Sequence, residues 1–450
     1  MPDSPANTAT RPAAGRLLRI LGVGFGIAVA IGTTISAGIV RTPGEIAARL
    51  PVAWLFVAVW VVGGLYALLG AFSLSELGAM IPREGGQYVF ARRALGDYAG
   101  FIVGWGDWVS CSSSVALIAI VVGEYTGDLL PALQTHTVAT SLALTLAIAL
   151  LQWLGVRWGS RIQEITAVLK ALGFLGLVVL FFVLGGKSPG QSHLALPAPH
   201  GLTLFLGLVL SMQAVIYAYD GWDSIVYFLE EVRDPAKEVP KAMIGSVLSI
   251  LGIYLLLNLG LVYILPMENF AGNNFALGLA AQRIFGAHGD AVIRVLMIVS
   301  LISGVNACLL EASRVLFGMS RDRFFSRRAA AVNKGGTPGI ALLLSTAVAV
   351  AFITTGSFAK VIAVTAFFFV ANYTISFISL FVLRRREPEA ARPYRAWGYP
   401  WTTGFALAGS LAFLAGAIAG DTRNSLWALV VLAASYPIYR VSKMLNPAAN

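Results

Sequence analysis

Charged residues are scarce in this chain. Only 12% of its 450 residues are Asp, Glu, Lys or Arg, whereas 57% are hydrophobic and 47 are glycine. Soluble globular domains carry about 25% charged residues, so this chain has too little charge to cover a water-exposed surface. The same composition excludes disordered, collagen-like and coiled-coil chains. We therefore expect the chain to be embedded in a lipid bilayer.

Cysteine and histidine are also rare. The two cysteines, Cys111 and Cys308, lie inside apolar segments, where buried thiols are expected in preference to a disulfide or a metal site. The four histidines fall near predicted outer loops and show no metal-ligand spacing. No polar stretch is long enough to form a catalytic domain. The sequence therefore predicts no enzyme activity, no metal and no cofactor.

Long apolar segments recur along the whole chain. A helix needs about 20 apolar residues to cross a bilayer, and continuous runs differ from the weak alternation of a membrane β-barrel. The sequence thus predicts an all-α membrane protein with 12 transmembrane helices. The predicted helices lie at residues 19–48, 52–80, 97–126, 137–156, 161–185, 202–230, 239–265, 288–319, 338–356, 358–384, 402–420 and 424–441.

The basic residues orient these segments. If the N-terminus is cytoplasmic, about three quarters of the 32 Lys and Arg residues fall in or beside cytoplasmic loops. This asymmetry predicts a multi-pass protein of a bacterial inner membrane with both termini in the cytoplasm. It also accounts for the net charge of +10, which would otherwise suggest a nucleic-acid partner. As partners we expect the lipid bilayer and a small molecule, no nucleic acid, and a chain that works as a monomer.

Two predicted spans are interrupted by residues that weaken helices. The first contains glycines, threonines and Pro43 within residues 32–44. The sixth contains Asp220-Gly221-Trp222-Asp223, where a carboxyl in an apolar run costs several kcal/mol unless it is paired or solvated. Interrupted helices at corresponding positions of two halves point to a transporter binding site. Close helix packing through small residues is the alternative explanation.

The two interruptions offer groups that suit an α-amino acid. After Ser36, a half-helix that begins at Ala37 and Gly38 would present free N–H groups and a positive dipole end to a carboxylate. Carbonyl oxygens nearby would accept hydrogen bonds from an ammonium group. The predicted substrate-binding residues are Thr34, Ser36, Ala37, Gly38, Tyr217, Asp220 and Gly221.

Lys170 is a basic residue inside a predicted span. It lies nine residues after Arg161, about 13 Å into the fifth helix. Its ammonium group could snorkel to the membrane interface. Alternatively, it could pair with backbone carbonyls of the interrupted first helix, at a site where a coupling cation would otherwise bind.

Together these motifs resemble the amino acid–polyamine–organocation superfamily, specifically its prokaryotic L-type amino acid transporter-like branch. The resemblance covers the first ten predicted helices and the loop after them. It rests on five motifs in order, at residues 32–44, 73–96, 217–231, 306–322 and 384–394.

The resemblance implies a five-plus-five inverted repeat, with broken helices 1 and 6, that works by alternating access. The repeats would span residues 19–185 and 202–384, preceded by a cytoplasmic segment, 1–18, and followed by helices 11 and 12 with a cytoplasmic tail, 385–450. It implies a sodium-independent transporter that exchanges neutral amino acids, with Tyr217 as the gate and Lys170 in the place of sodium. A carrier for cationic amino acids or polyamines and a non-transporting amino acid sensor remain alternatives.

The sequence departs from the family pattern near the first interruption. Where the family usually has Gly-Ser-Gly, this chain has Ser36-Ala37-Gly38. The loss of the first glycine leaves the backbone less conformational freedom there. Arg41 follows on the outer side and would favour anionic or neutral substrates over cationic ones. At the end of the sixth span, Glu230 and Glu231 are expected to form a solvated cytoplasmic helix end.

Overall fold

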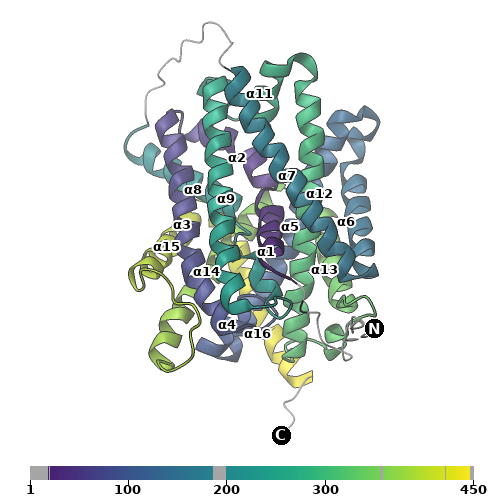
Figure 1. Cartoon of the computed structure of the whole chain (residues 1–450), viewed down its shortest axis with the longest axis vertical. Helices are drawn as coiled ribbons and strands as arrows, with labels where there is room; N and C mark the ends of the chain where they lie inside the picture. Colours follow the sequence, from purple (N-terminus) through teal and green to yellow (C-terminus); the bar gives the residue numbers. More distant parts are fainter. Residues whose placement is uncertain (1–18, 20, 186–198, 355–357, 421, 446–450) are drawn as a thin grey trace, which may run out of the picture.

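The chain folds into an elongated bundle of helices (Figure 1). A computed structural model describes residues 19, 21–185, 199–354, 358–420 and 422–445. These residues contain no β-strand, only a single bridge between Leu21 and Val232. The predicted segment 1–18 lies outside the described residues. The all-α fold predicted from the composition is therefore confirmed.

The α-helices range from short connecting helices to long apolar ones. They are Val23–Thr34 (α1), Ala37–Arg49 (α2), Ala53–Met80 (α3), Tyr88–Leu95 (α4), Asp97–Leu129 (α5), Thr137–Leu154 (α6), Val156–Leu184 (α7), Gly201–Tyr219 (α8), Pro235–Ile264 (α9), Met267–Phe270 (α10), Ala276–Phe285 (α11), Gly289–Arg321 (α12), Gly339–Thr354 (α13), Phe358–Arg386 (α14), Trp401–Gly420 (α15) and Thr422–Leu445 (α16). Short 3-10 helices occupy Pro131–His136 (η1), Ser224–Phe228 (η3), Gly286–His288 (η4) and Arg327–Ala330 (η5).

The number of membrane spans depends on how the bent pair α1–α2 and the short helix α13 are counted. Among the described residues, ten helices are long and apolar enough to cross a bilayer. The helices α1 and α2 form an eleventh span if the pair, bent by 46°, is counted as one. With 16 residues, α13 is shorter than the others. The predicted twelve spans are therefore reached only if α13 also crosses.

The order of the helices repeats. Between its second and third spans, the first half carries the short helix α4, and the second half carries α11 in the corresponding place. These two helices lie at opposite ends of the bundle, α4 at the bottom and α11 at the top of Figure 1. An inverted repeat predicts this arrangement, whereas its limits at 19–185 and 202–384 stay predictions. We call the two ends of the bundle the α4 end and the α11 end.

The centre of the bundle is α5. Its most apolar stretch is entirely buried, and it packs against α4, α6, α12, α13 and α14. By contrast, α7 exposes large apolar side chains such as Leu169, Leu172 and Val179, as a lipid-facing helix should. Because lipid is itself apolar, close packing and internal polar contacts hold such helices together. Polar groups around α5 therefore need a specific explanation.

Candidate functional site

The first predicted interruption is a real break between α1 and α2. Helix α1 ends at Thr34, and α2 begins at Ala37 after two non-helical residues. Gly38 is needed there because a Cβ atom at this position would lie 2.6 Å from the Cα atom of Ala218 in α8. The break therefore packs directly against the end of α8.

The second break lies at the end of α8. The helix stops at Tyr219, Asp220 is extended, and Gly221 has a φ angle of +101°, which favours glycine. A Cβ atom on Gly221 would also lie 2.8 Å from the Cβ atom of Thr33. The predicted breaks in the first and sixth spans are thus confirmed. The fold brings them side by side, although about 180 residues of chain separate them.

Tyr254 of α9 joins the two breaks. Its hydroxyl lies 2.7 Å from the carbonyl oxygen of Thr34 and 2.9 Å from that of Ala218. The Thr34 carbonyl also accepts the Ser36 N–H, at 2.8 Å. A carbonyl oxygen has two lone pairs, so both are used here. Binding of a substrate ammonium group at Thr34, as predicted, requires one of these partners to move.

We expect Tyr254→Phe to lower the free energy of unfolding by about 1–3 kcal/mol, because two buried carbonyl groups lose a donor. Thermal unfolding of the purified protein measures this change. Tyr263→Phe is the matched control, since the Tyr263 side chain is 50% exposed on the same helix. Equal melting temperatures for the two variants would show that the Tyr254 hydroxyl does not hold the breaks together.

Lys170 reaches the first break from α7. Its Nζ atom donates to the carbonyl oxygens of Gly32, at 2.9 Å, and Ile35, at 2.7 Å. The side chain is 1% exposed, so the ammonium group does not snorkel to an interface. The carbonyl groups that a continuous helix would have bonded internally are instead paired with a fixed positive charge.

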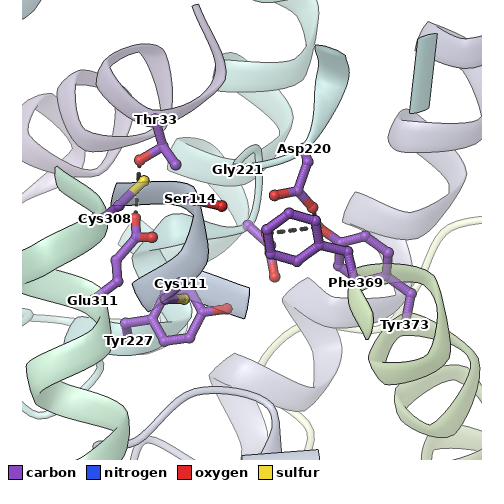
Figure 2. A pocket seen from close by; sticks show the side chains of 11 residues that line it. Thr33, Cys111, Ser114, Asp220, Gly221, Tyr227, Cys308, Glu311, Phe369 and Tyr373 are labelled. Atoms are coloured by element: carbon purple, nitrogen blue, oxygen red, sulfur yellow. Dashed lines mark hydrogen bonds between the residues drawn. The ribbon is translucent and has the colours of Figure 1, made fainter. Parts of the chain in front are cut away.

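A small cavity lies directly below the breaks (Figure 2). Its volume is about 10 Å³, room for about one water molecule. Figure 2 shows Asp220 and Tyr373 on one side, Thr33, Cys308 and Glu311 on the other, and Ser114 between them. An amino acid cannot enter this space unless the surrounding helices move.

Carboxyl groups surround this cavity. The Tyr373 hydroxyl lies 2.6 Å from Asp220 Oδ1 and 3.1 Å from Asp223 Oδ1. On the opposite side, Thr33 Oγ1 donates to Glu311 Oε1 at 2.9 Å. Asp107 of α5 is also buried nearby and accepts a hydrogen bond from Tyr227, which lines the cavity, at 3.0 Å.

Asp107 and Glu311 are not among the residues predicted from the sequence. Each is an acidic residue inside a long helix, α5 or α12, and both side chains are at most 3% exposed. The criterion that identified Lys170, an ionisable residue within an apolar span, applies equally to them. Cys111 and Cys308 also line the cavity, and they are free and buried as predicted.

Ion pairs close the α4 end. Arg314 of α12 lies 3.2 Å from Glu231, and both side chains are 1% exposed. The expectation of a solvated end is therefore wrong for Glu231, because Arg314 pairs with it inside the protein. Glu230 binds Arg321 at 2.5 Å. Burial raises the pKa of the adjacent Glu84 carboxyl, and the charge of Glu231 raises this pKa further.

Contacts also close the α11 end. Arg41 pairs with Glu124 of α5, and the Gly272 N–H donates to the Gly44 carbonyl at 2.7 Å. Because the Glu124 carboxylate offsets the charge of Arg41, this residue gives no basis for the expected preference for anionic or neutral over cationic substrates. Access to the cavity from either end therefore requires these contacts to open.

Comparisons with known proteins agree with this architecture. The family described as amino acid permease matches residues 26–436. The serine/threonine exchanger SteT of Bacillus subtilis (strain 168) is 26% identical over 432 residues, which cover 94% of this chain and 96% of that protein. The human large neutral amino acids transporter small subunit 2 is 25% identical, over 84% of this chain and 72% of that protein. The mouse Asc-type amino acid transporter 1 is 26% identical, over 84% of this chain and 73% of that protein. These matches confirm the predicted resemblance, and the chain belongs to the amino acid permease family.

Proposed function

We propose that the chain is a sodium-independent secondary transporter that exchanges neutral amino acids by alternating access. The observation that carries this proposal is the pair of helix breaks, which pack together above a cavity. Side-chain and backbone contacts separate this cavity from both ends of the bundle. The relatives named serine/threonine exchanger and large neutral amino acids transporter support the substrate class. On this proposal the chain is a carrier and not an enzyme.

Backbone groups at the breaks would bind the substrate. The first N–H groups of α2, at Ala37 and Gly38, have no partner within the helix and suit the α-carboxylate, and the Ser36 N–H would join them once it leaves the Thr34 carbonyl. The carbonyls of Tyr217 and Asp220, at the end of α8, would receive the ammonium group, together with Thr34 once its present partners move. Gly221 would let the backbone turn there.

Lys170 would supply the charge that a bound sodium ion supplies in a cation-coupled carrier. Its ammonium group already bonds the carbonyl oxygens of Gly32, in the last turn of α1, and Ile35, in the first break. A fixed cation holds these oxygens without an ion gradient. We therefore propose sodium-independent transport.

We further propose that the chain acts as a monomer in a bacterial inner membrane. The α4 end and both termini would lie in the cytoplasm, as the distribution of the basic residues indicates.

Tyr217 would act as the gate. Its side chain is 8% exposed and packs with Leu117, Ile216 and Val370 beside the breaks.

Tyr217→Ala is expected to fold but to release bound substrate faster, because the ring no longer covers the site. Substrate dissociation rates measure this, with Tyr263→Ala as an exposed control. A dissociation rate equal to that of the unmodified protein, for both small and bulky amino acids, would remove Tyr217 from this role.

Transport by reconstituted protein tests the proposal. Liposomes preloaded with serine should take up labelled serine faster than empty liposomes, and the twenty amino acids should compete according to substrate class. Binding without uptake would indicate an amino acid sensor instead. Uptake that is equal with and without preloading would exclude obligatory exchange.

A further inference from the structure

Three buried ionisable side chains meet at the α4 end. Glu84, in the loop between α3 and α4, Glu231, which follows η3, and Arg314 of α12 are each at most 1% exposed. Arg314 donates from Nε to Glu231 Oε1 at 3.2 Å and from Nη1 to the carbonyl oxygen of Leu310 at 3.5 Å. The group thus holds two carboxyl groups and one guanidinium. If both carboxyl groups were ionised, one buried negative charge would have no counterpart, which is costly.

The charged groups around these three residues are paired with one another. The pairs are Glu230–Arg321, Arg83–Asp322 and Arg92–Asp322, and the Tyr88 hydroxyl also donates to Asp322. Within the described ranges, Arg314 is therefore the one cation that forms an ion pair with Glu84 or Glu231. No second basic side chain offsets the second carboxyl group.

The two carboxyl groups contact each other. The Glu84 N–H donates to Glu230 Oε1 at 3.1 Å, and the Glu230 N–H donates to Glu84 Oε2 at 3.4 Å. These bonds hold the Glu84 side chain beside Glu231, and the two side chains form a hydrogen bond. Glu84 Oε1 is buried and receives no donor from another described residue. Two ionised carboxylates cannot share a hydrogen bond, because each can only accept, so one of the two must carry a proton.

The carboxyl pair joins the first broken span to α12. The Leu21 N–H, two residues before α1, donates to the Glu231 carbonyl oxygen at 2.9 Å, and the Arg233 N–H donates to the Leu21 carbonyl at 3.0 Å. On the other side, a Cβ atom at Gly318 of α12 would lie 2.9 Å from the Glu84 carbonyl oxygen. Any opening of the α4 end between α1 and α12 must therefore separate these groups and admit water to them.

We infer that Glu84 and Glu231 form a proton-binding site, which holds one proton while the α4 end is closed and releases it when that end opens. The inference rests on the proposed function, because opening of the α4 end is a step of alternating access. In the closed state one carboxylate faces one guanidinium, and the charges balance. On opening, the carboxyl O–H bond breaks, the proton passes to water, and two solvated carboxylates remain.

This site makes opening depend on pH. Burial raises the pKa of both carboxyl groups, so the closed state keeps the proton at pH values where a solvated Glu, with a pKa of about 4.3, has lost it. Because the closed state binds one proton more than the open state, low pH favours the closed α4 end. Rising pH favours the open end, by at most about ten-fold per pH unit, until the pH exceeds the raised pKa of the pair.

Infrared spectroscopy of the full chain in nanodiscs at neutral pH tests whether the pair holds a proton. Glu84→Gln should lose part of the C=O stretching band of protonated carboxyl groups. Glu389→Gln, which removes an exposed carboxylate at the same end, should retain the whole band. Glu231→Gln should also lose part of it and serves as the second variant if Glu84→Gln does not fold. A band of equal strength in the unmodified protein and in the Glu84 and Glu231 variants would overturn the inference.

Serine exchange in preloaded liposomes tests the effect on opening, with equal pH on both sides between about pH 5 and about pH 8. The unmodified protein and Glu389→Gln should accelerate by at least about five-fold as the pH rises. Glu84→Gln should change by less than about two-fold, because the glutamine amide donates to Glu231 at every pH, as the proton does. The same pH dependence in Glu84→Gln and Glu389→Gln would overturn the inference. Absence of exchange by the unmodified protein would contradict the proposed function, while the infrared bands would still show whether the pair holds a proton.

Discussion

Lys170→Ala is expected to slow amino acid exchange by about ten-fold or more while changing substrate affinity by less than about three-fold. The variant leaves the Gly32 and Ile35 carbonyls without their ammonium donor. An unpaired buried carbonyl costs about 1–3 kcal/mol, so the break no longer keeps one defined geometry through the transport cycle. The substrate groups at α2 and α8 are untouched, and binding from the open side should therefore persist.

Measurements of initial exchange rate and equilibrium binding in the same preparation distinguish these effects. Lys241→Ala is the matched control, because Lys241 is exposed near the start of α9 and contacts neither break. Its exchange rate should equal that of the unmodified protein. If Lys170→Ala exchanged as fast as Lys241→Ala, the ammonium group would have no part in transport.

Arg314→Ala should cause the largest loss of stability, about 3–5 kcal/mol. Removing the guanidinium leaves Glu231 as a buried carboxylate without its partner, beside the buried Glu84. The guanidinium also lies over the Phe228 ring, with its carbon 5.4 Å from the ring centroid, so packing is lost as well. Thermal unfolding, combined with proteolysis at the α4 end, measures the loss.

A double-mutant cycle isolates the pair. Arg314→Ala with Glu231→Ala should recover much of the stability lost in Arg314→Ala, because no unpaired charge remains. The exposed pair Arg93–Glu387 is the control, and Arg93→Ala should cost about 0–1 kcal/mol. Additive effects of the two buried substitutions would mean that Arg314 and Glu231 do not close the α4 end as a unit.

The helix breaks could be predicted from sequence because their cause is local. Glycine, proline and aspartate weaken a helix wherever they stand, so residues 32–44 and 220–223 are visible without a structure. Lys170 can be identified for the same reason, since a lysine in an apolar span needs a partner or a route to the interface. The fold class followed directly from composition and from the lengths of the apolar runs.

The partners of these residues could not be predicted because they come from distant helices. The sequence predicts a solvated Glu231 because its partner, Arg314, lies 83 positions later on another helix. Tyr254 is an ordinary aromatic residue in an apolar helix, and only the fold brings its hydroxyl to Thr34 and Ala218. The neutral donors around Asp107 and Glu311 likewise become visible only when the helices are packed.

The central claim is that Lys170 stands where a coupling cation would otherwise be needed. The most direct test compares uptake of labelled serine into preloaded liposomes in sodium chloride and in choline chloride. Our account predicts equal initial rates in the two salts. An uptake rate that rises with sodium concentration in the unmodified protein would contradict it.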